Sequence, residues 1–267
     1  MDTIGIDLAA QDAKTAVCTI SWRAGTASVA PPLGGADGIT EDALVEAVGR
    51  GDWVGIDSPF GWPAGFVRAV SGYAEREPWP DLDADALRYR LTDQLVRKEL
   101  GISPLSVSSD RIGVAAWRCA RLLTLARDGR KAADRTGRDR IVEVYPGAAL
   151  TRWGLERRGY KASGNSERKQ GQRMKREELL KELEKSADWL GWEGDARDRC
   201  VESDDFLDAF LCALIARAAA VGLTVWPGKK KKKEWKAARV EGWIHLPLAD
   251  SLPELLQASE KPPPPRP

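Results

Sequence analysis

The chain has 267 residues, of which 43% are hydrophobic and 30% charged, with a net charge of +1. This composition suits a globular domain with a sizeable core, and the absence of any apolar run near 18 residues argues against a membrane-spanning protein. Scattered cysteines and a start without a basic, apolar leader predict reduced thiols and a cytoplasmic location. The single histidine, His245, leaves the chemistry to carboxylates, lysines or a metal, because zinc sites and serine triads would have to use it.

The first part of the chain predicts a sheet. Apolar and β-branched residues predict strands over 3–8, 15–22 and 26–30, which short turns would join into an antiparallel meander. Thr40 is expected to cap a helix, and an apolar strand is expected over 52–57.

A long segment of about residues 60–140 follows and predicts a helical insert, because the next strand begins only at its end. The expected elements are helices near 64–70, 92–100 and 114–127, a strand over 141–145, helices over 148–153, 175–189 and 203–221, and an extended segment over 241–246. Residues 160–173 and 229–236 are polar and basic and predict loops, the first of them mobile. The domain is expected to span residues 1–248, followed by a proline-rich tail over 249–267.

Two predicted strands end in the same way, in Gly5-Ile6-Asp7 and Gly55-Ile56-Asp57. Chemistry in open α/β sheets gathers at the carboxyl ends of strands, so we expect the two aspartates to lie close together. Like charges at short range repel unless a cation lies between them, and hard divalent cations prefer oxygen ligands. The two strand ends therefore predict half of a Mg²⁺ or Mn²⁺ site.

The other half is expected from the helix that begins near Asp204. Asp205 and Asp208 are three residues apart and share a helix face. Compensation of the helix dipole explains acids in the first turn, but it explains Asp208 poorly because the helix becomes apolar there. Asp208 is therefore predicted as a metal ligand, whereas Asp205 can serve either purpose.

Glu143 lies in the middle of an apolar strand, where an unpaired carboxylate is costly to bury. It can be a fourth acid of the site, or it can pair with Arg111 or Arg118.

Basic residues gather in stretches 111–140, 157–176 and 229–233. They are either solvated faces or a binding surface for a polyanion, on which Lys231 would contact phosphate. Trp62 follows the second aspartate closely and can line the site or stack on a base, although core packing is the simpler interpretation.

Seven short motifs occur in order: GIDLA (5–9), GIDSPFGWP (55–63), YRLTD (89–93), SSDRI (108–112), EVYP (143–146), DDFLDA (204–209) and EGWIHLP (241–247). Together they resemble the ribonuclease-H-like superfamily and, more closely, domain-of-unknown-function family 429, whose members are predicted nucleases. The resemblance covers nearly the whole chain. It implies an α/β fold in which a mixed sheet, an antiparallel three-strand meander plus parallel strands, is flanked by helices and carries a helical insert.

The same resemblance implies that Asp7, Asp57 and Asp208 bind metal and are catalytic, with Asp205 as an additional acid. Arg90, Asp110 and Arg111 resemble residues that face the site. The two arginines could clamp a phosphate in a bidentate manner, or they could form surface ion pairs.

The expected function is that of a divalent-metal-dependent nuclease or phosphodiesterase acting on DNA, RNA or a nucleotide. Two alternatives remain open. One is a non-catalytic nucleic-acid-binding module, and the other is a nucleotide-binding phosphotransferase of the actin-like branch.

Overall fold

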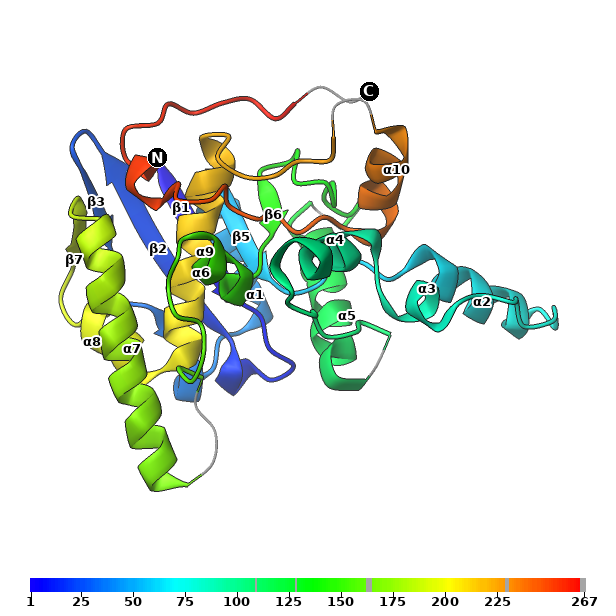
Figure 1. Ribbon diagram of the computed structural model, residues 1–267, viewed down its shortest axis with the longest axis horizontal. Helices are drawn as coiled ribbons and strands as arrows, with labels where there is room; N and C mark the ends of the chain where they lie inside the picture. The colour runs from blue at the N-terminus through cyan, green and yellow to red at the C-terminus, as the bar shows by residue number, and fades with distance from the viewer. Residues whose placement is uncertain (109, 128, 162–164, 229–230, 265–267) are drawn as a thin grey trace.

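The computed structural model describes residues 1–108, 110–127, 129–161, 165–228 and 231–264, with the backbone alone at 110–111. A seven-stranded mixed sheet forms the centre, and helices flank it on both faces (Figure 1). The strands are β1 Asp2–Asp7, β2 Ala16–Arg23, β3 Thr26–Val29, β4 Leu33–Gly34, β5 Trp53–Asp57, β6 Ile141–Glu143 and β7 Leu190–Trp192. Their order is β6-β5-β1-β2-β3-β7, and β4 pairs with β2.

The helices are α1 Glu41–Arg50, α2 Ala64–Ala74, α3 Ala84–Arg88, α4 Leu91–Leu100, α5 Asp110–Leu125, α6 Pro146–Arg152, α7 Ser166–Ser186, α8 Ala196–Glu202, α9 Asp204–Ala220 and α10 Lys232–Glu241. Helix α9 covers one face of the sheet together with α6, α7 and α8, while α1 and α5 pack on the other. Helices α2 and α3 project from the body (Figure 1). None of the helices described is both long and apolar enough to cross a membrane.

The sheet brings the two aspartate-ending strands into register. Strands β1, β2 and β3 form the predicted antiparallel meander, whereas β1 pairs with β5 and β5 with β6 in parallel. Gly5 lies beside Gly55 and Asp7 beside Asp57. The two carboxylates therefore leave the same edge of the sheet from adjacent strands, as the sequence predicts.

Two glycines allow helix α9 to lie directly on these strands. A Cβ atom at Gly5 would come within 1.9 Å of the Ala209 carbonyl oxygen, and one at Gly55 within 2.4 Å of the Cys212 carbonyl oxygen. Both positions therefore require glycine, and the close approach of the helix backbone explains why α9 makes its most extensive contacts with β1. This close approach also fixes where the first turns of α9 lie relative to the ends of β1 and β5.

Two predicted loops are wrong. The region predicted as a mobile loop over 160–173 contains the start of α7, where Asn165 accepts a hydrogen bond from the Arg168 amide. Part of its inward face is polar, since Gln172 and Arg176 are buried, so apolar periodicity cannot reveal it. The basic loop over 229–236 is largely helix α10, in which Trp235 and Ala238 are buried three residues apart. Residues 229 and 230 lie outside those described.

Part of the segment predicted as a tail packs against the core. Leu252 and Leu255, in a 3₁₀ turn over Leu252–Leu255, are buried in the same cluster as α9. The extended segment over 241–246 contributes a bridge between Ile244 and Glu143, beside β6. Strand β7 and helices α3 and α8 are further elements that sequence patterns do not predict, because all three are short.

Candidate metal centre

Three carboxylates from distant parts of the chain converge at one edge of the sheet. Asp7 ends β1, Asp57 ends β5, and Asp208 lies in the second turn of α9. One carboxylate oxygen from each lies within 4.8 Å of the others, and these are the residues that the sequence predicts as metal ligands. An all-oxygen donor set at this spacing suits a hard divalent cation.

The environment of these acids opposes their ionisation. Burial raises the pKa of Asp7 well above its usual value, and the neighbouring carboxylates of Asp208 and Asp57 raise it further. The pKa of Asp57 is raised to about 7, mainly by burial and partly by Asp208, although Lys161 lowers it. A bound divalent cation would remove both causes, since it compensates the repulsion and replaces the lost solvation.

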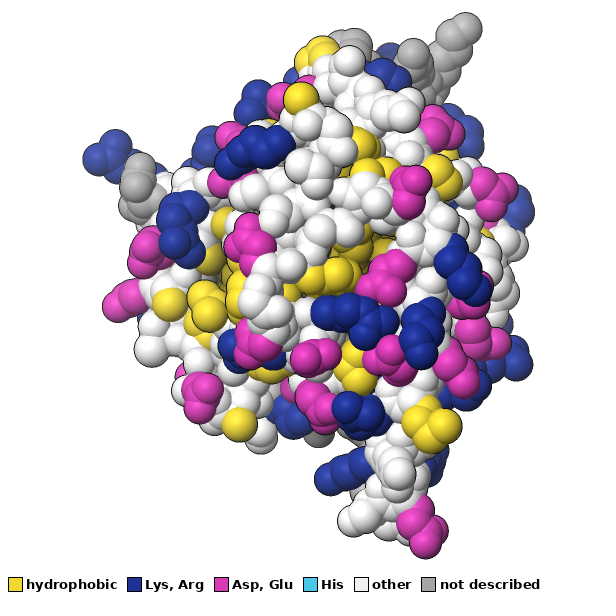
Figure 2. All heavy atoms as spheres, turned by 90° about the vertical axis from the view of Figure 1, so that its left-hand side faces the viewer, with side chains coloured by type: hydrophobic (Ala, Val, Ile, Leu, Met, Phe, Trp, Pro, Cys, Tyr) yellow, Lys and Arg dark blue, Asp and Glu magenta, His cyan; other side chains and the backbone are white. Residues whose placement is uncertain are grey.

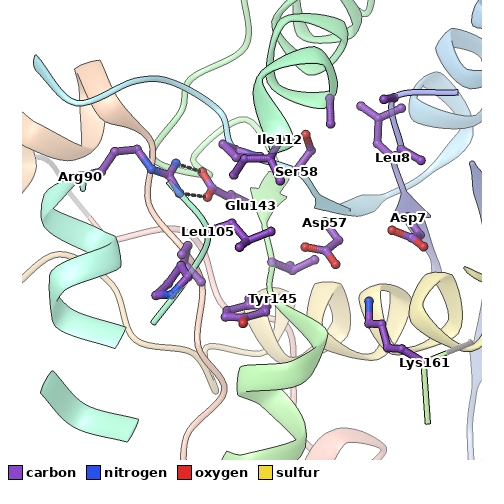
Figure 3. Close-up of a pocket in the computed structure, with 17 residues that line it drawn as sticks. Asp7, Leu8, Asp57, Ser58, Arg90, Leu105, Ile112, Glu143, Tyr145 and Lys161 are labelled. Carbon is purple, nitrogen blue, oxygen red and sulfur yellow. Dashed lines mark hydrogen bonds and ion pairs between the residues drawn. The ribbon is translucent and has the colours of Figure 1, made fainter. Parts of the chain in front are cut away.

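Tyr160 and Lys161 complete the cluster, and the sequence predicts neither as a site residue. The Tyr160 hydroxyl donates a hydrogen bond of 2.7 Å to Oδ1 of Asp208, and the Lys161 ammonium forms an ion pair with Oδ2. The side chain of Lys161 is 58% exposed, so its stem reaches from solvent to the carboxylates (Figure 3). Its partner Asp208 is 47 residues away in the chain, so no local motif could have indicated this contact.

Arg90 and Glu143 form a buried ion pair beside the cluster (Figure 3). The guanidinium makes five hydrogen bonds, two to Asp93, two to Glu143 and one to the Glu241 carbonyl. These bonds use its five N–H donors, so Arg90 has no donor left with which to bind a phosphate in the predicted bidentate manner. Pairing of Glu143 with Arg118 is wrong as well, since Arg118 binds Asp12.

The carboxylate of Glu143 is likewise engaged, with Oε1 and Oε2 both bound by Arg90 and the Phe60 amide donating to Oε2. Burial raises the pKa of Glu143, and the Arg90 charge opposes this. Glu143 thus lies beside the three-aspartate cluster as the counter-ion of Arg90, and not as a fourth member of it.

Three further predicted residues are described by the structure and lie outside the three-aspartate cluster. Asp205, one turn before Asp208, forms an ion pair of 3.4 Å with Lys14. Trp62 is half-buried and Lys231 pairs with Glu234 at 2.8 Å; neither lines the cavity beside the cluster. The side chains of Asp110 and Arg111 lie outside the described residues.

His245 is buried and does not belong to the three-aspartate cluster. Its Nε2 contacts the Thr136 carbonyl at 3.1 Å and its Nδ1 the Thr224 hydroxyl at 3.2 Å, and burial lowers its pKa to about 4.

A cavity of about 500 Å³ opens directly beside the carboxylates and is lined by Asp7, Asp57 and Lys161 among others (Figure 3).

The raised pKa values predict a stability that falls as pH rises. Asp7 and Asp57 bind a proton more tightly in the folded than in the unfolded chain. The contribution of Asp57 is therefore complete at about pH 4 and is lost as pH rises through about 7, and Asp7 acts in the same direction. The melting temperature in EDTA is expected to drop across this window, by more in the native chain than in Asp57→Asn. Mn²⁺ should raise it at about pH 8 but hardly at about pH 5. A stabilisation by Mn²⁺ that is equal at both pH values would contradict this assignment.

Comparison with known proteins gives a family but no characterised relative. A family model described as "Protein of unknown function (DUF429)" matches residues 5–232, a range that includes all three aspartates. No curated protein and no solved structure matches the chain. Because the matched range covers most of the 267 residues, the chain belongs to the DUF429 family.

Proposed function

We propose that this protein is a phosphodiester hydrolase that depends on Mg²⁺ or Mn²⁺ and acts on a nucleic acid or nucleotide. The observation that carries the proposal is the convergence of Asp7, Asp57 and Asp208 within 4.8 Å. Keeping three carboxylates this close is costly without a cation, as the raised pKa values of Asp7 and Asp57 indicate. An arrangement that costs stability and faces a cavity is typical of a functional site.

The topology supports a ribonuclease-H-like assignment within this proposal. An antiparallel meander of β1, β2 and β3 continues into the parallel strands β5 and β6, and α9 crosses β1. This is the order that the sequence resemblance implies, with acids at the ends of β1 and β5 and on the last long apolar helix. Fold likeness alone does not establish activity, so the proposal depends on the carboxylates.

The donor set fits a hard divalent cation. Asp7, Asp57 and Asp208 each offer a carboxylate oxygen, and among the side chains that the structure describes no arginine binds any of the three. When bound, such an ion supplies Lewis acidity toward a phosphoryl oxygen and an activated water as nucleophile.

The neighbouring residues have two supporting roles. Tyr160 holds Oδ1 of Asp208 and thereby orients that carboxylate. Lys161 brings a positive charge to the cluster through its ion pair with Asp208. With a divalent ion bound to the aspartates, the Lys161 ammonium would be available to bind a phosphate oxygen, the role that the sequence suggests for Arg90.

The test is a substrate panel with the intact chain. Single-stranded, duplex and branched DNA, RNA and cyclic nucleotides are incubated with Mg²⁺, with Mn²⁺ or with EDTA. We expect cleavage of at least one phosphodiester with either metal and none with EDTA. Binding without turnover under every metal would instead indicate a non-catalytic module, and ATP hydrolysis without phosphodiester cleavage would indicate the phosphotransferase.

A further inference from the structure

The cavity beside the carboxylates has two chemically different sides. Figure 3 shows Asp7, Asp57 and Lys161 close together, with the apolar side chains of Leu8 and Ile112 above them in the view. Ala115 also lines the cavity. Part of the apolar side comes from the helical insert, which supplies Pro104, Leu105, Ile112 and Ala115. Tyr145, which follows β6, adds an aromatic ring.

The size of the cavity limits what can enter. Its volume of about 500 Å³ lies within the range of about 300–1,000 Å³ that is typical of small-molecule sites. A site with an apolar wall and a few polar groups at one end selects a ligand of the same pattern. Here the polar end, with a divalent cation on the aspartates, would bind a phosphate and the apolar end a flat, weakly polar group.

The charges around the cavity do not favour a long polyanion. Of the residues that line it, Arg90 and Lys161 are cationic, and the donors of Arg90 are all used by other groups, so Lys161 alone among them is available for a phosphate. Within the described part of the basic stretches many cations are paired too, as in Arg121 with Glu41, Arg127 with Asp139, Arg173 with Glu202 and Lys175 with Glu178. The face shown in Figure 2 likewise mixes acidic and basic side chains. Polynucleotide binding draws its affinity from unpaired lysines and arginines that displace counterions, and paired cations supply less of it.

We infer that the site takes a nucleotide-sized phosphodiester, a dinucleotide or the free end of a strand, with one base in the apolar part of the cavity. The inference rests on the proposed function and specifies its substrate. The interior of a closed duplex is excluded as a substrate, because its bases are stacked and cannot reach the cavity without being extruded.

The first experiment compares substrates with and without ends. Dinucleotides and covalently closed circular duplex DNA are incubated with the intact protein and Mn²⁺ at equal phosphodiester concentration. We expect the dinucleotides to be hydrolysed and the closed circles to stay intact. Nicking of the circles at a rate similar to dinucleotide hydrolysis would overturn the inference while leaving the proposed hydrolase in place.

The second experiment fills the cavity without touching the carboxylates. Ala115→Trp places a large ring in the apolar part, and Ala120→Trp is its control on the same helix, also half-buried but outside the cavity lining. Affinity for the deoxynucleoside 5′-monophosphates, tested one by one with Mn²⁺ by titration calorimetry, should fall at least about tenfold in Ala115→Trp. Mn²⁺ affinity should stay unchanged in both variants.

The binding measurement distinguishes the inference about the cavity from the proposed hydrolase activity. Unchanged nucleotide affinity in Ala115→Trp, or no measurable nucleotide binding by the native chain, overturns the inference even if cleavage is observed. Nucleotide binding that depends on Ala115 without any hydrolysis supports the cavity assignment and counts against the hydrolase alone.

Discussion

Asp7→Asn and Asp208→Asn are each expected to abolish Mg²⁺- and Mn²⁺-dependent cleavage while the protein stays folded. Each substitution removes one negative charge and one strong oxygen donor from the three carboxylates that we propose as the ion site. The loss should exceed the roughly 10- to 100-fold decrease that follows removal of a group that only orients a ligand. Cleavage rates and Mn²⁺ affinity by titration calorimetry measure the effect, and far-UV circular dichroism checks the fold.

Asp205→Asn is the matched control for these variants. Asp205 lies on α9 one turn before Asp208, and its substitution makes the same chemical change, but its carboxylate pairs with Lys14. We expect cleavage to fall much less than in Asp208→Asn. The metal-free Asp7→Asn protein should also melt no lower than the native chain, because the substitution removes a buried carboxylate whose pKa is raised by burial and by repulsion from Asp208 and Asp57. Full activity in both ligand variants would refute the metal site.

The strand-end aspartates could be predicted because their information is local. Two apolar runs that each end in Gly-Ile-Asp specify buried strands with the acid at the carboxyl end, and parallel pairing then places Asp7 beside Asp57. The same glycines that form the motif also admit helix α9, so Asp208 reaches both strand ends. Strand pattern and helix spacing were therefore sufficient for the three central residues.

The residues around this centre could not be predicted in the same way. An unpaired carboxylate in a buried strand is costly, so the sequence correctly implies that Glu143 must be compensated. Its partner, Arg90, is 53 residues away and is placed by the packing of the insert. Lys161 reaches Asp208 from a segment whose polar composition predicts only a loop. Such contacts depend on how elements pack, and neither periodicity nor spacing encodes that.

The ion pair and hydrogen bonds of Arg90 also connect the insert to the sheet. The guanidinium joins the start of α4 to Glu143 on β6 and to the Glu241 carbonyl at the end of α10. The Glu241 carboxylate in turn accepts hydrogen bonds from the Ala64 and Leu91 amides at the starts of α2 and α4. This network anchors the insert against the sheet, and it therefore holds the apolar wall of the cavity in place.

Arg90→Met is accordingly expected to lower the free energy of unfolding by about 3–5 kcal/mol, the cost of breaking a buried ion pair. The substitution leaves Glu143 and Asp93 buried, with their carboxylates deprived of the charge that compensates them. Urea unfolding followed by tryptophan fluorescence measures the change. A phosphate clamp would show the opposite pattern, with normal stability and a raised KM.

The control on the same helix is Arg97→Met, whose side chain is exposed and pairs with Asp85 at 3.6 Å. An exposed pair contributes at most about 1 kcal/mol, so this variant should unfold almost as the native chain does. Glu143→Gln added to Arg90→Met should recover part of the lost stability, because it removes one of the two stranded charges. If Arg90→Met were no more destabilising than Arg97→Met, the buried network would not be what fixes the insert, and the shape of the cavity would need another explanation.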